Sequence, residues 1–280
     1  MNAWVTLLTQ SSYLPGVRVL GRSLKQVRSQ YPLVVMVTDT VEAEVQNTLT
    51  AEGYILQTVE RLDPASDLVS RYLFPHYSEV WTKLRVWEME TLTRAVLLDA
   101  DMLVLKNMDE LFDIELPEDG VAAVHSCKCN YHKKPKYPQS WVPENCFYSR
   151  YEVTGKADYG LATLDDYFNA GLIVLQPNPK VLKELIERIE AIDPTRNLPF
   201  PEQDILNDHF QGKWRTLPYS YNALKQLAFG HPRMWNINAI KNLHYTLKKP
   251  WEVKLGEPDE YESLNELWWQ THASLQSRDK

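Results

Sequence analysis

The first hundred residues alternate between short apolar runs and stretches of helical periodicity, and this alternation constrains the fold more than any other feature. Strands are expected at residues 3–9, 33–38, 54–59 and 94–100, and helices at 15–30, 41–51 and 78–92. In the first of these helices, apolar residues recur at helical spacing behind Pro15. Continuous apolar strands separated by helices are typical of a mostly parallel sheet with helices on both faces. The sequence therefore predicts an α/β fold.

The composition is that of a globular protein with an acidic balance. Of the 280 residues, 44% are hydrophobic and 24% are charged, the formal net charge is −7, and the pI is about 5.6. Binding to nucleic acid or to an anionic membrane needs a basic face, so neither partner is expected. No apolar run approaches the roughly 20 residues that span a bilayer, and the N-terminus lacks the basic region of a signal peptide. We therefore expect a cytoplasmic protein.

The second half of the sequence opens with a long segment that has no clear period. Residues 126–166 are rich in Lys, Tyr, Pro and Cys, and this is long for a loop inside a compact domain unless the segment is functional. Regular patterns follow it: a strand at 167–177, helices at 179–192, 201–210 and 262–276, and a strand running into a turn at 240–251. Since no repeat or linker is visible, residues 1–280 are predicted to form a single domain, with one half at about 1–107 and the other at about 108–280.

Two aspartates stand at the end of the apolar run 94–100, in the stretch RAVLLDADMLVLKN. Ionised carboxylates are rarely buried without a partner, so Asp99 and Asp101 need either solvent or a positive charge. In an extended chain residues i and i+2 face the same side, and Ala100 between them would be turned away. Two oxygen ligands at the carboxyl end of a strand suit Mg²⁺ or Mn²⁺. Taken alone, such a pair is more often a solvated turn or a helix cap.

The wider context of the two aspartates resembles a known family. The stretch LLDADMLVLKNMDELF is similar to the signature of family 8 glycosyltransferases, a retaining group that includes glycogenin and galactinol synthase. Five further blocks resemble the family's segments in the family's order: WVTLLTQSSYLPGVRVLGRSLKQ, WTKLRVW, YFNAGLIVLQPN, PEQDILN and LHYTLKKPW. Together the blocks span residues 4–251. The resemblance implies a GT-A fold, which is Rossmann-like, and an enzyme that transfers a hexose from a UDP-sugar.

The resemblance implies a metal centre. Asp99 and Asp101 would hold Mn²⁺ together with His244, because an imidazole beside carboxylates favours Mn²⁺, with Mg²⁺ as the alternative. The metal would bridge the two phosphates and neutralise the leaving UDP. Lys249 would add positive charge on the phosphates. Leu247 stands where glycogenin has a glycine, in a turn one residue shorter, and its backbone N–H would reach a phosphate.

The resemblance also implies a nucleotide pocket near the N-terminus. Leu7, Thr9 and Tyr13 match the family's uridine pocket, with Tyr13 placed to stack on the uracil. Gln10 stands where glycogenin has an asparagine. Ala100 would present its backbone to the ribose.

The sugar pocket and the catalytic groups are implied by two later blocks. Asn169 and Gln203 would line the sugar pocket, and Asp204 would bond to sugar hydroxyls. Lys83 would contact the sugar or a phosphate. Glu202 stands where glycogenin has an aspartate that is a candidate nucleophile, and Gln203 could stabilise positive charge through its amide oxygen. The anomeric configuration of the transferred sugar can be retained in two ways. Either a carboxylate attacks first and two displacements follow, or the acceptor attacks from the front face through an oxocarbenium-like ion. The sequence leaves both open.

Several short features favour the galactinol synthase branch of the resemblance. These are FNAG, EQD, the pairs YN and HP, and a cysteine-containing segment before FNAG. No tyrosine lies between Asn222 and His244, the interval in which glycogenin carries the tyrosine that it glycosylates. We expect UDP-galactose or UDP-glucose as the donor substrate and a small polyol or sugar as the acceptor, with myo-inositol as the candidate acceptor. The alternatives are a glycogenin-like glucosyltransferase acting on a glycan or protein, and a non-catalytic UDP-sugar-binding protein; a homodimer is possible in each case.

Three cysteines lie in the irregular segment 126–166. An odd number of cysteines, Cys127, Cys129 and Cys146, implies no disulfide framework. Together with His125 or His132 they could hold zinc, but their spacing matches no standard zinc finger. Free or buried thiols are therefore the favoured interpretation.

Overall fold

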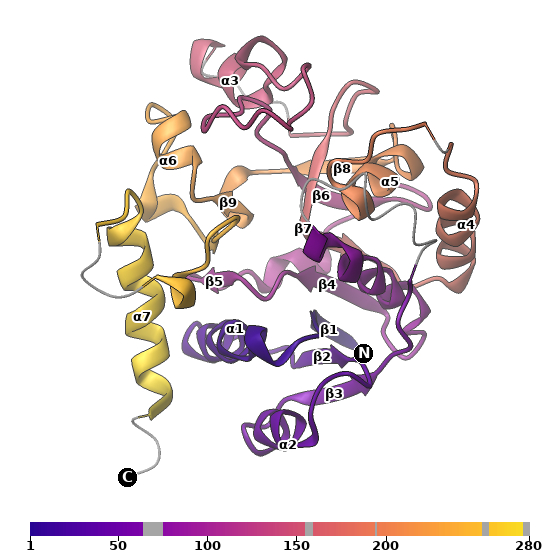
Figure 1. Ribbon diagram of the computed structural model, residues 1–280, viewed down its shortest axis with the longest axis vertical. Coiled ribbons are helices and arrows are strands. Elements are labelled where there is room, and N and C mark those ends of the chain that lie inside the picture. The colour runs from indigo at the N-terminus through magenta and orange to yellow at the C-terminus, as the bar shows by residue number, and fades with distance from the viewer. Residues whose placement is uncertain (64–74, 155–158, 194, 254–257, 277–280) are drawn as a thin grey trace.

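The computed structural model describes residues 1–63, 75–154, 159–193, 195–253 and 258–276 (Figure 1). In this part of the chain, seven strands form a main sheet in the order β3-β2-β1-β4-β7-β6-β8. The strands are β1 (Asn2–Leu8), β2 (Leu33–Val37), β3 (Ile55–Thr58), β4 (Arg94–Leu98), β6 (Val121–His125), β7 (Phe168–Leu175) and β8 (Trp214–Leu217).

The strand directions confirm a mostly parallel sheet and add one reversal. β1 runs parallel to β2 and β4, β2 to β3, and β6 to β8. β7 is antiparallel to both of its neighbours, β4 and β6. The chain leaves β6 at the carboxyl edge of the parallel strands, passes through residues 126–166 and enters β7 from that same edge, so no crossover is needed. The start of β7 therefore lies beside the end of β4.

A second sheet joins the two halves of the sequence. Its strands lie in the order β5-β10-β9, with β5 (Met102–Val104), β9 (Ala223–Leu224) and β10 (Asn242–His244). β10 is antiparallel to β5 and pairs His244 with Met102, the residue after Asp101. The strand expected at 240–251 is thus shorter than predicted. It nevertheless brings a histidine next to the two aspartates, although more than a hundred residues separate them.

Helices cover both faces of the main sheet (Figure 1). The α-helices are α1 (Leu14–Gln26), α2 (Ala43–Ala51), α3 (Phe147–Thr154), α4 (Pro179–Glu190), α5 (Pro201–His209), α6 (Leu227–Gly230) and α7 (Glu262–Gln276). Short 3-10 helices are η1 (Ser11–Tyr13), η4 (Asp109–Asp113), η5 (Pro143–Asn145), η6 (Tyr219–Tyr221), η7 (Ile237–Ala239) and η8 (Pro250–Glu252). Five predicted helices are confirmed as α1, α2, α4, α5 and α7. The helix expected at 78–92 is instead the 3-10 helix η3 (Pro75–Glu88), while α3, α6, β6 and β8 were not predicted.

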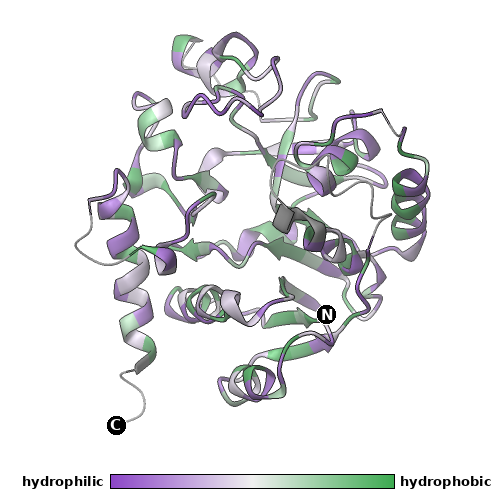
Figure 2. Ribbon diagram, viewed as in Figure 1, coloured by the Kyte–Doolittle hydropathy of each residue, from purple (hydrophilic) through white to green (hydrophobic). Residues whose placement is uncertain are grey.

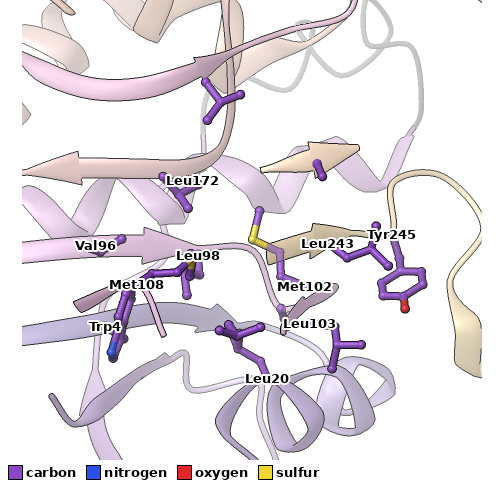
Figure 3. Close-up of a cluster of buried hydrophobic side chains, with 14 of the residues drawn as sticks. Trp4, Leu20, Val96, Leu98, Met102, Leu103, Met108, Leu172, Leu243 and Tyr245 are labelled. Atoms are coloured by element: carbon purple, nitrogen blue, oxygen red, sulfur yellow. The ribbon is translucent and has the colours of Figure 1, made fainter. Parts of the chain in front are cut away.

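The core has two parts because alternate residues of each strand face opposite sides of the sheet. In β4, Val96 and Leu98 belong to the cluster under α1, α7 and the small sheet, whereas Ala95 and Leu97 face η3, α4 and α5. Figure 3 shows the first cluster, in which Leu20 of α1 lies near strand residues of both sheets. Hydrophobic residues concentrate in the central strands, while the helices carry hydrophilic residues as well (Figure 2). Burial on both faces accounts for the unbroken apolar runs in the sequence.

The C-terminal helix completes the first core cluster. Trp268 of α7 is fully buried, with its ring 5.4 Å from that of Trp251, so this helix packs into the core. Arg22 of α1 donates to the hydroxyl of Ser274 over 3.0 Å, which ties α7 to α1. No helix among the described residues is both long and apolar enough to cross a membrane.

Gly16 is the point of closest approach between α1 and the β4–β5 turn. A Cβ at Gly16 would lie 2.6 Å from the carbonyl oxygen of Ala100 and 2.8 Å from the ring of Trp251. We expect Gly16→Ala to lower the free energy of unfolding by about 1–3 kcal/mol, measured by urea denaturation, because the backbone of the turn must move. Gly230→Ala is the control, since its Cβ would meet only Tyr131 at 3.8 Å. A stabilisation of about 1 kcal/mol, as at an exposed helical glycine, would contradict this packing.

Candidate active site

The two aspartates lie in the turn between β4 and β5. β4 ends at Leu98, so Asp99 and Asp101 do not share the face of an extended strand, and that part of the prediction is wrong. The turn still directs both carboxylates to one place. His244 Nε2 lies 3.2 Å from Asp101 Oδ1 and 3.7 Å from Asp99 Oδ2. One potential ligand atom from each of the three residues lies within 4.8 Å of the others, so the group can hold a metal ion.

Hydrogen bonds fix which nitrogen of His244 faces the carboxylates. The backbone N–H of Gly171 donates to Asn169 Oδ1 over 3.0 Å, which identifies that atom as the oxygen. Asn222 must then donate its amide to the same oxygen, over 2.9 Å, and turn its own oxygen to His244 Nδ1 at 2.8 Å. Nδ1 therefore carries a proton, and Nε2 is the nitrogen that faces the carboxylates and is available to a metal ion. Orientation of a ligating histidine by such a partner is typical of metal sites.

The donor set fits a hard or borderline divalent cation. Two carboxylates with one neutral imidazole are suitable ligands for Mn²⁺ and for Mg²⁺. His244 and Asp101 are almost fully buried, while the Asp99 side chain keeps 26% of its surface exposed. The site is therefore open to the cleft on the side of Asp99. This geometry supports a metal site and does not identify the metal.

Each aspartate is also paired with a lysine. Lys83 Nζ lies 2.7 Å from Asp99 Oδ1 and 3.2 Å from Glu202 Oε1, and the Lys249 ammonium bonds to Asp101 Oδ2. Burial alone would lower the pKa of Lys83, but the two carboxylates outweigh it and raise that pKa above its usual value. Burial would likewise raise the pKa of Asp101, but Lys249 and His244 hold it well below its usual range. The group is thus a compact cluster of charges.

A chain of hydrogen bonds connects this cluster to the later block. Gln203 Oε1 accepts from Asn169 Nδ2 and from the backbone of Ala170, each over 3.0 Å. Gln203 Nε2 donates to the hydroxyl of Tyr167 over 3.1 Å, and that hydroxyl donates to Asp204 Oδ1 over 2.6 Å. Burial raises the pKa of Asp204 to about 6, against the lowering effect of the Tyr167 hydrogen bond. The Gln203 side chain is therefore held by three groups of the protein, and its oxygen already accepts two hydrogen bonds.

Eight of the residues described above border a single cleft of about 890 Å³, namely Lys83, Asp99, Asp101, Asn169, Glu202, Gln203, His244 and Lys249. The other predicted residues that line it are Leu7, Thr9, Gln10, Tyr13, Ala100 and Leu247. Tyr13 packs edge-on against Trp251, with the ring centroids 5.5 Å apart. The structure thus brings the residues named from the sequence together, except Asp204, which is not part of the lining and accepts a hydrogen bond from Tyr167.

Two residues of the site were not identified from the sequence. Asn222 is fully buried and orients His244, and Tyr167 links Gln203 to Asp204. In the sequence, the YN pair that contains Asn222 served only as one of the features that favour the galactinol synthase branch. A polar residue followed by the apolar pair Ala223–Leu224 is a weak signal of a buried hydrogen bond, because burying a polar side chain requires a partner.

Leu247 occupies a backbone conformation that favours glycine, with φ of 63°. The left-handed region costs an L-residue roughly 1–2 kcal/mol. The loop therefore keeps the conformation that a glycine would provide and stores strain beside the cleft.

We expect Leu247→Gly to change the free energy of unfolding by less than about 1 kcal/mol, because released strain offsets the lost side chain. Leu247→Val should lower it by about 1–2 kcal/mol, since a β-branched residue resists positive φ. Thermal and urea unfolding measure both. Equal destabilisation by the two variants would mean that the Leu247 side chain, not its backbone, determines stability here.

We expect Asn222→Ala to weaken Mn²⁺ binding by about 10–100-fold, the usual effect of removing a partner that orients a ligand. The physical reason is that His244 loses the acceptor for its Nδ1–H and can rotate. Titration of free Mn²⁺ by electron paramagnetic resonance gives the affinity. Asn238→Ala, at an exposed asparagine of η7, is the matched control and should leave it unchanged. Unchanged Mn²⁺ affinity in Asn222→Ala would remove His244 from the metal site.

Comparison with known proteins agrees with this geometry. A family model described as glycosyl transferase family 8 matches residues 4–254. Galactinol synthase 1 from Solanum lycopersicum is 32% identical over 279 residues, covering 95% of this chain and 80% of that protein. Galactinol synthase 7 from Arabidopsis thaliana is 32% identical over 276 residues, covering 96% and 80%.

Solved structures share the fold. The galactosyltransferase LgtC, in complex with donor and acceptor sugar analogs, has a TM-score of 0.64 at 19% identity and covers 98% of this chain and 96% of its own. The glycosyltransferase GlyE of Streptococcus pneumoniae has a TM-score of 0.63 at 18% identity and covers 97% of this chain. The present chain spans 61% of the length of GlyE. The chain belongs to the family 8 glycosyltransferases, has the GT-A fold and is a glycosyltransferase.

Proposed function

We propose that this glycosyltransferase transfers a hexose, with galactose as the first choice, from a UDP-sugar to a small polyol such as myo-inositol, with Mn²⁺ as cofactor. The observation that carries the proposal is the joining of Asp99, Asp101 and His244 with two lysines in one cleft. The identity of about 30% to galactinol synthases over nearly the whole chain supports galactose and an inositol-like acceptor.

The proposed donor site extends from β1 to the loop after β10. Leu7, Thr9, Gln10 and Tyr13 would form the uridine pocket, because Leu7 lies near the end of β1, the other three follow this strand, and all four line the cleft. Ala100 would present its backbone to the ribose. Residues of about 1–107 would thus bind most of the nucleotide and residues of about 108–280 the sugar and the acceptor, with His244, Leu247 and Lys249 of the second part reaching the diphosphate.

The phosphates of the donor would lie against the cluster of charges. A bound Mn²⁺ would act as a Lewis acid on the diphosphate and neutralise the departing UDP. Lys249 would move its ammonium from Asp101 to a phosphate oxygen, where it stabilises the charge that grows as the sugar–phosphate bond breaks. The backbone N–H of Leu247 would donate to a phosphate, held in place by the left-handed turn.

The sugar would lie between β7 and α5. Asn169 and Gln203 would line its pocket, and the hydrogen bonds on both would keep their side chains fixed as the sugar binds. Glu202 shares Lys83 with Asp99, so it lies beside the metal site and keeps its role as candidate nucleophile. Asp204 would act on sugar hydroxyls only through Tyr167, unless that ring moves. Both double displacement and front-face attack, which would each retain the anomeric configuration, are compatible with these groups.

The acceptor would bind against the wall formed by residues 126–166. Ser126, Asn130, Tyr131, Tyr137 and Trp141 of this segment line the cleft opposite the donor site. Hydroxyl, amide and aromatic groups of this kind suit a polyol, which offers hydroxyls at its edge and C–H groups on its face. A self-glycosylating reaction is not favoured, because no tyrosine lies at 223–243.

The test is a screen for UDP release and product formation. UDP-galactose and UDP-glucose are each combined with myo-inositol, simple sugars or buffer alone, with Mn²⁺, Mg²⁺ or EDTA. We expect Mn²⁺-dependent UDP release that myo-inositol stimulates, with UDP-galactose preferred. Absence of turnover with both donors would contradict the donor assignment, and turnover that only a glycan stimulates would contradict the polyol.

In the same assay, Asp101→Asn should reduce turnover by roughly 10²–10³-fold, because a preorganised charge at the diphosphate is lost. Asp119→Asn, at an exposed turn residue with positive φ, is the control for a lost carboxylate. Circular dichroism verifies that both variants fold. Full activity of Asp101→Asn would refute the role of this residue at the metal site.

A further inference from the structure

A second group of potential metal ligands lies away from the aspartates, at the base of the irregular segment. We refer to it as the Cys3His cluster, and its members are Cys127, Cys129, Cys146 and His231. The sulfur atoms of Cys127, Cys129 and Cys146 lie 3.4, 3.2 and 3.7 Å from His231 Nε2, respectively. The sulfurs of Cys127 and Cys146 are 3.9 Å apart.

These spacings match the edges of a tetrahedron around zinc. With Zn–S bonds of about 2.3 Å and a Zn–N bond of about 2.0–2.1 Å, tetrahedral ligands lie about 3.8 Å apart for two sulfurs and about 3.6 Å apart for sulfur and nitrogen. The observed separations fall around these values. All four ligand atoms lie within 4.8 Å of one another.

The protein also orients the histidine as zinc would require. His231 Nδ1 lies 3.2 Å from Glu152 Oε2, and a carboxylate can only accept, so Nδ1 carries the proton. Nε2 then directs its lone pair at the three sulfurs. The other oxygen of Glu152 accepts from the backbone N–H groups of Arg233 and Met234, over 3.1 and 3.3 Å, which fixes the carboxylate. In zinc sites, a carboxylate usually accepts a hydrogen bond from the ring nitrogen of the histidine that does not bind the metal.

Neither of the histidines considered from the sequence, His125 or His132, belongs to the cluster. His125 faces Asp166, with Nε2 at 3.3 Å, and its ring stacks on Phe147. His132 bonds to the hydroxyl of Tyr261 over 2.9 Å. The fourth ligand, His231, lies 85 residues after Cys146 and could not be selected from local spacing.

From this geometry we infer that the Cys3His cluster is a structural zinc site that fastens the 126–166 segment to α6. Cys127 and Cys129 follow β6, Cys146 precedes α3, and His231 directly follows α6. Four protein ligands complete a tetrahedral shell and leave no position for substrate, which is the mark of a structural site rather than a catalytic one. The inference does not depend on the proposed function.

The location explains why such a link would be useful. The segment is long, and in the part that the structure describes its helices and strands are limited to η5 and α3, so few regular backbone hydrogen bonds order it. Metal ligation supplies folding free energy where a core is small. Since Ser126 and Cys127 also line the cleft, a zinc ion at this position would hold the proposed acceptor wall in register with the donor site.

The first test measures the metal in the full-length protein, after dialysis against EDTA to remove exchangeable ions. We expect about one zinc per chain by mass spectrometry, since a closed thiolate site retains its metal. His231→Ala should lose nearly all of it, whereas His231→Cys should keep it as a four-cysteine site. His132→Ala is the matched control and should keep the zinc of the unmodified protein. Zinc retained in His231→Ala, or lost equally in His132→Ala, would overturn the assignment.

The second test works even where a variant fails to fold. Replacement of zinc by Co²⁺ in the unmodified protein should produce visible bands of tetrahedral cobalt and a sulfur-to-cobalt charge-transfer band in the near ultraviolet. The charge-transfer band separates this site from the Asp99–Asp101–His244 group, which has no sulfur ligand, and it should persist in Asp101→Asn. A protein that contains no zinc, gives no such band and has three freely reacting thiols or a disulfide would refute the inference.

Discussion

Asp101 keeps its charge although its side chain is almost completely buried, and the compensation of this charge organises the cleft. An uncompensated carboxylate in such a position costs several kcal/mol. Lys249 and His244 provide the compensation, and both belong to the segment that pairs with β5. The pairing of β10 with β5 is therefore more than a contact between strands. It attaches the C-terminal half of the chain to the turn on which the metal site depends.

The balance of charge explains how one cluster can receive both a cation and an anion. With His244 neutral, as it must be when it binds a metal, the carboxylates of Asp99, Asp101 and Glu202 exceed the ammonium groups of Lys83 and Lys249 by one charge. The excess of one negative charge attracts a divalent cation. Once that cation is bound, the lysines are less strongly attracted to the aspartates, and an anionic diphosphate can take their place as partner. Cation and nucleotide are thus expected to favour each other's binding.

Much of this fold could be predicted from the sequence, and the limits of the prediction have physical causes. Apolar runs such as Leu33–Val37 mark strands buried on both faces, so the parallel part of the sheet was visible. β6 reads VAAVH, and its two alanines weaken the signal. The reversal of β7 depends on where the preceding segment begins and ends in space. His244 was named through the resemblance to a family, since no local pattern separates a ligand from an ordinary buried histidine. His231 was missed because a ligand contributed by a distant helix leaves no spacing to recognise.

The two metal centres inferred for this chain differ in donor chemistry, and this difference lets them coexist. Carboxylates with one imidazole suit Mn²⁺, whereas three thiolates with one imidazole select zinc strongly. A zinc ion that prefers sulfur would be retained at the Cys3His cluster and would leave the oxygen-rich site to a more labile cation. The arrangement also bears on specificity. Discrimination between hexoses that differ in one hydroxyl, or between polyols, requires pocket walls held within a fraction of an ångström. The proposed donor side of the cleft is built on the main sheet, but the proposed acceptor side is built on an irregular segment. A zinc ion that cross-links this segment at the end of β6 would give the proposed acceptor side a rigidity that its own secondary structure cannot supply.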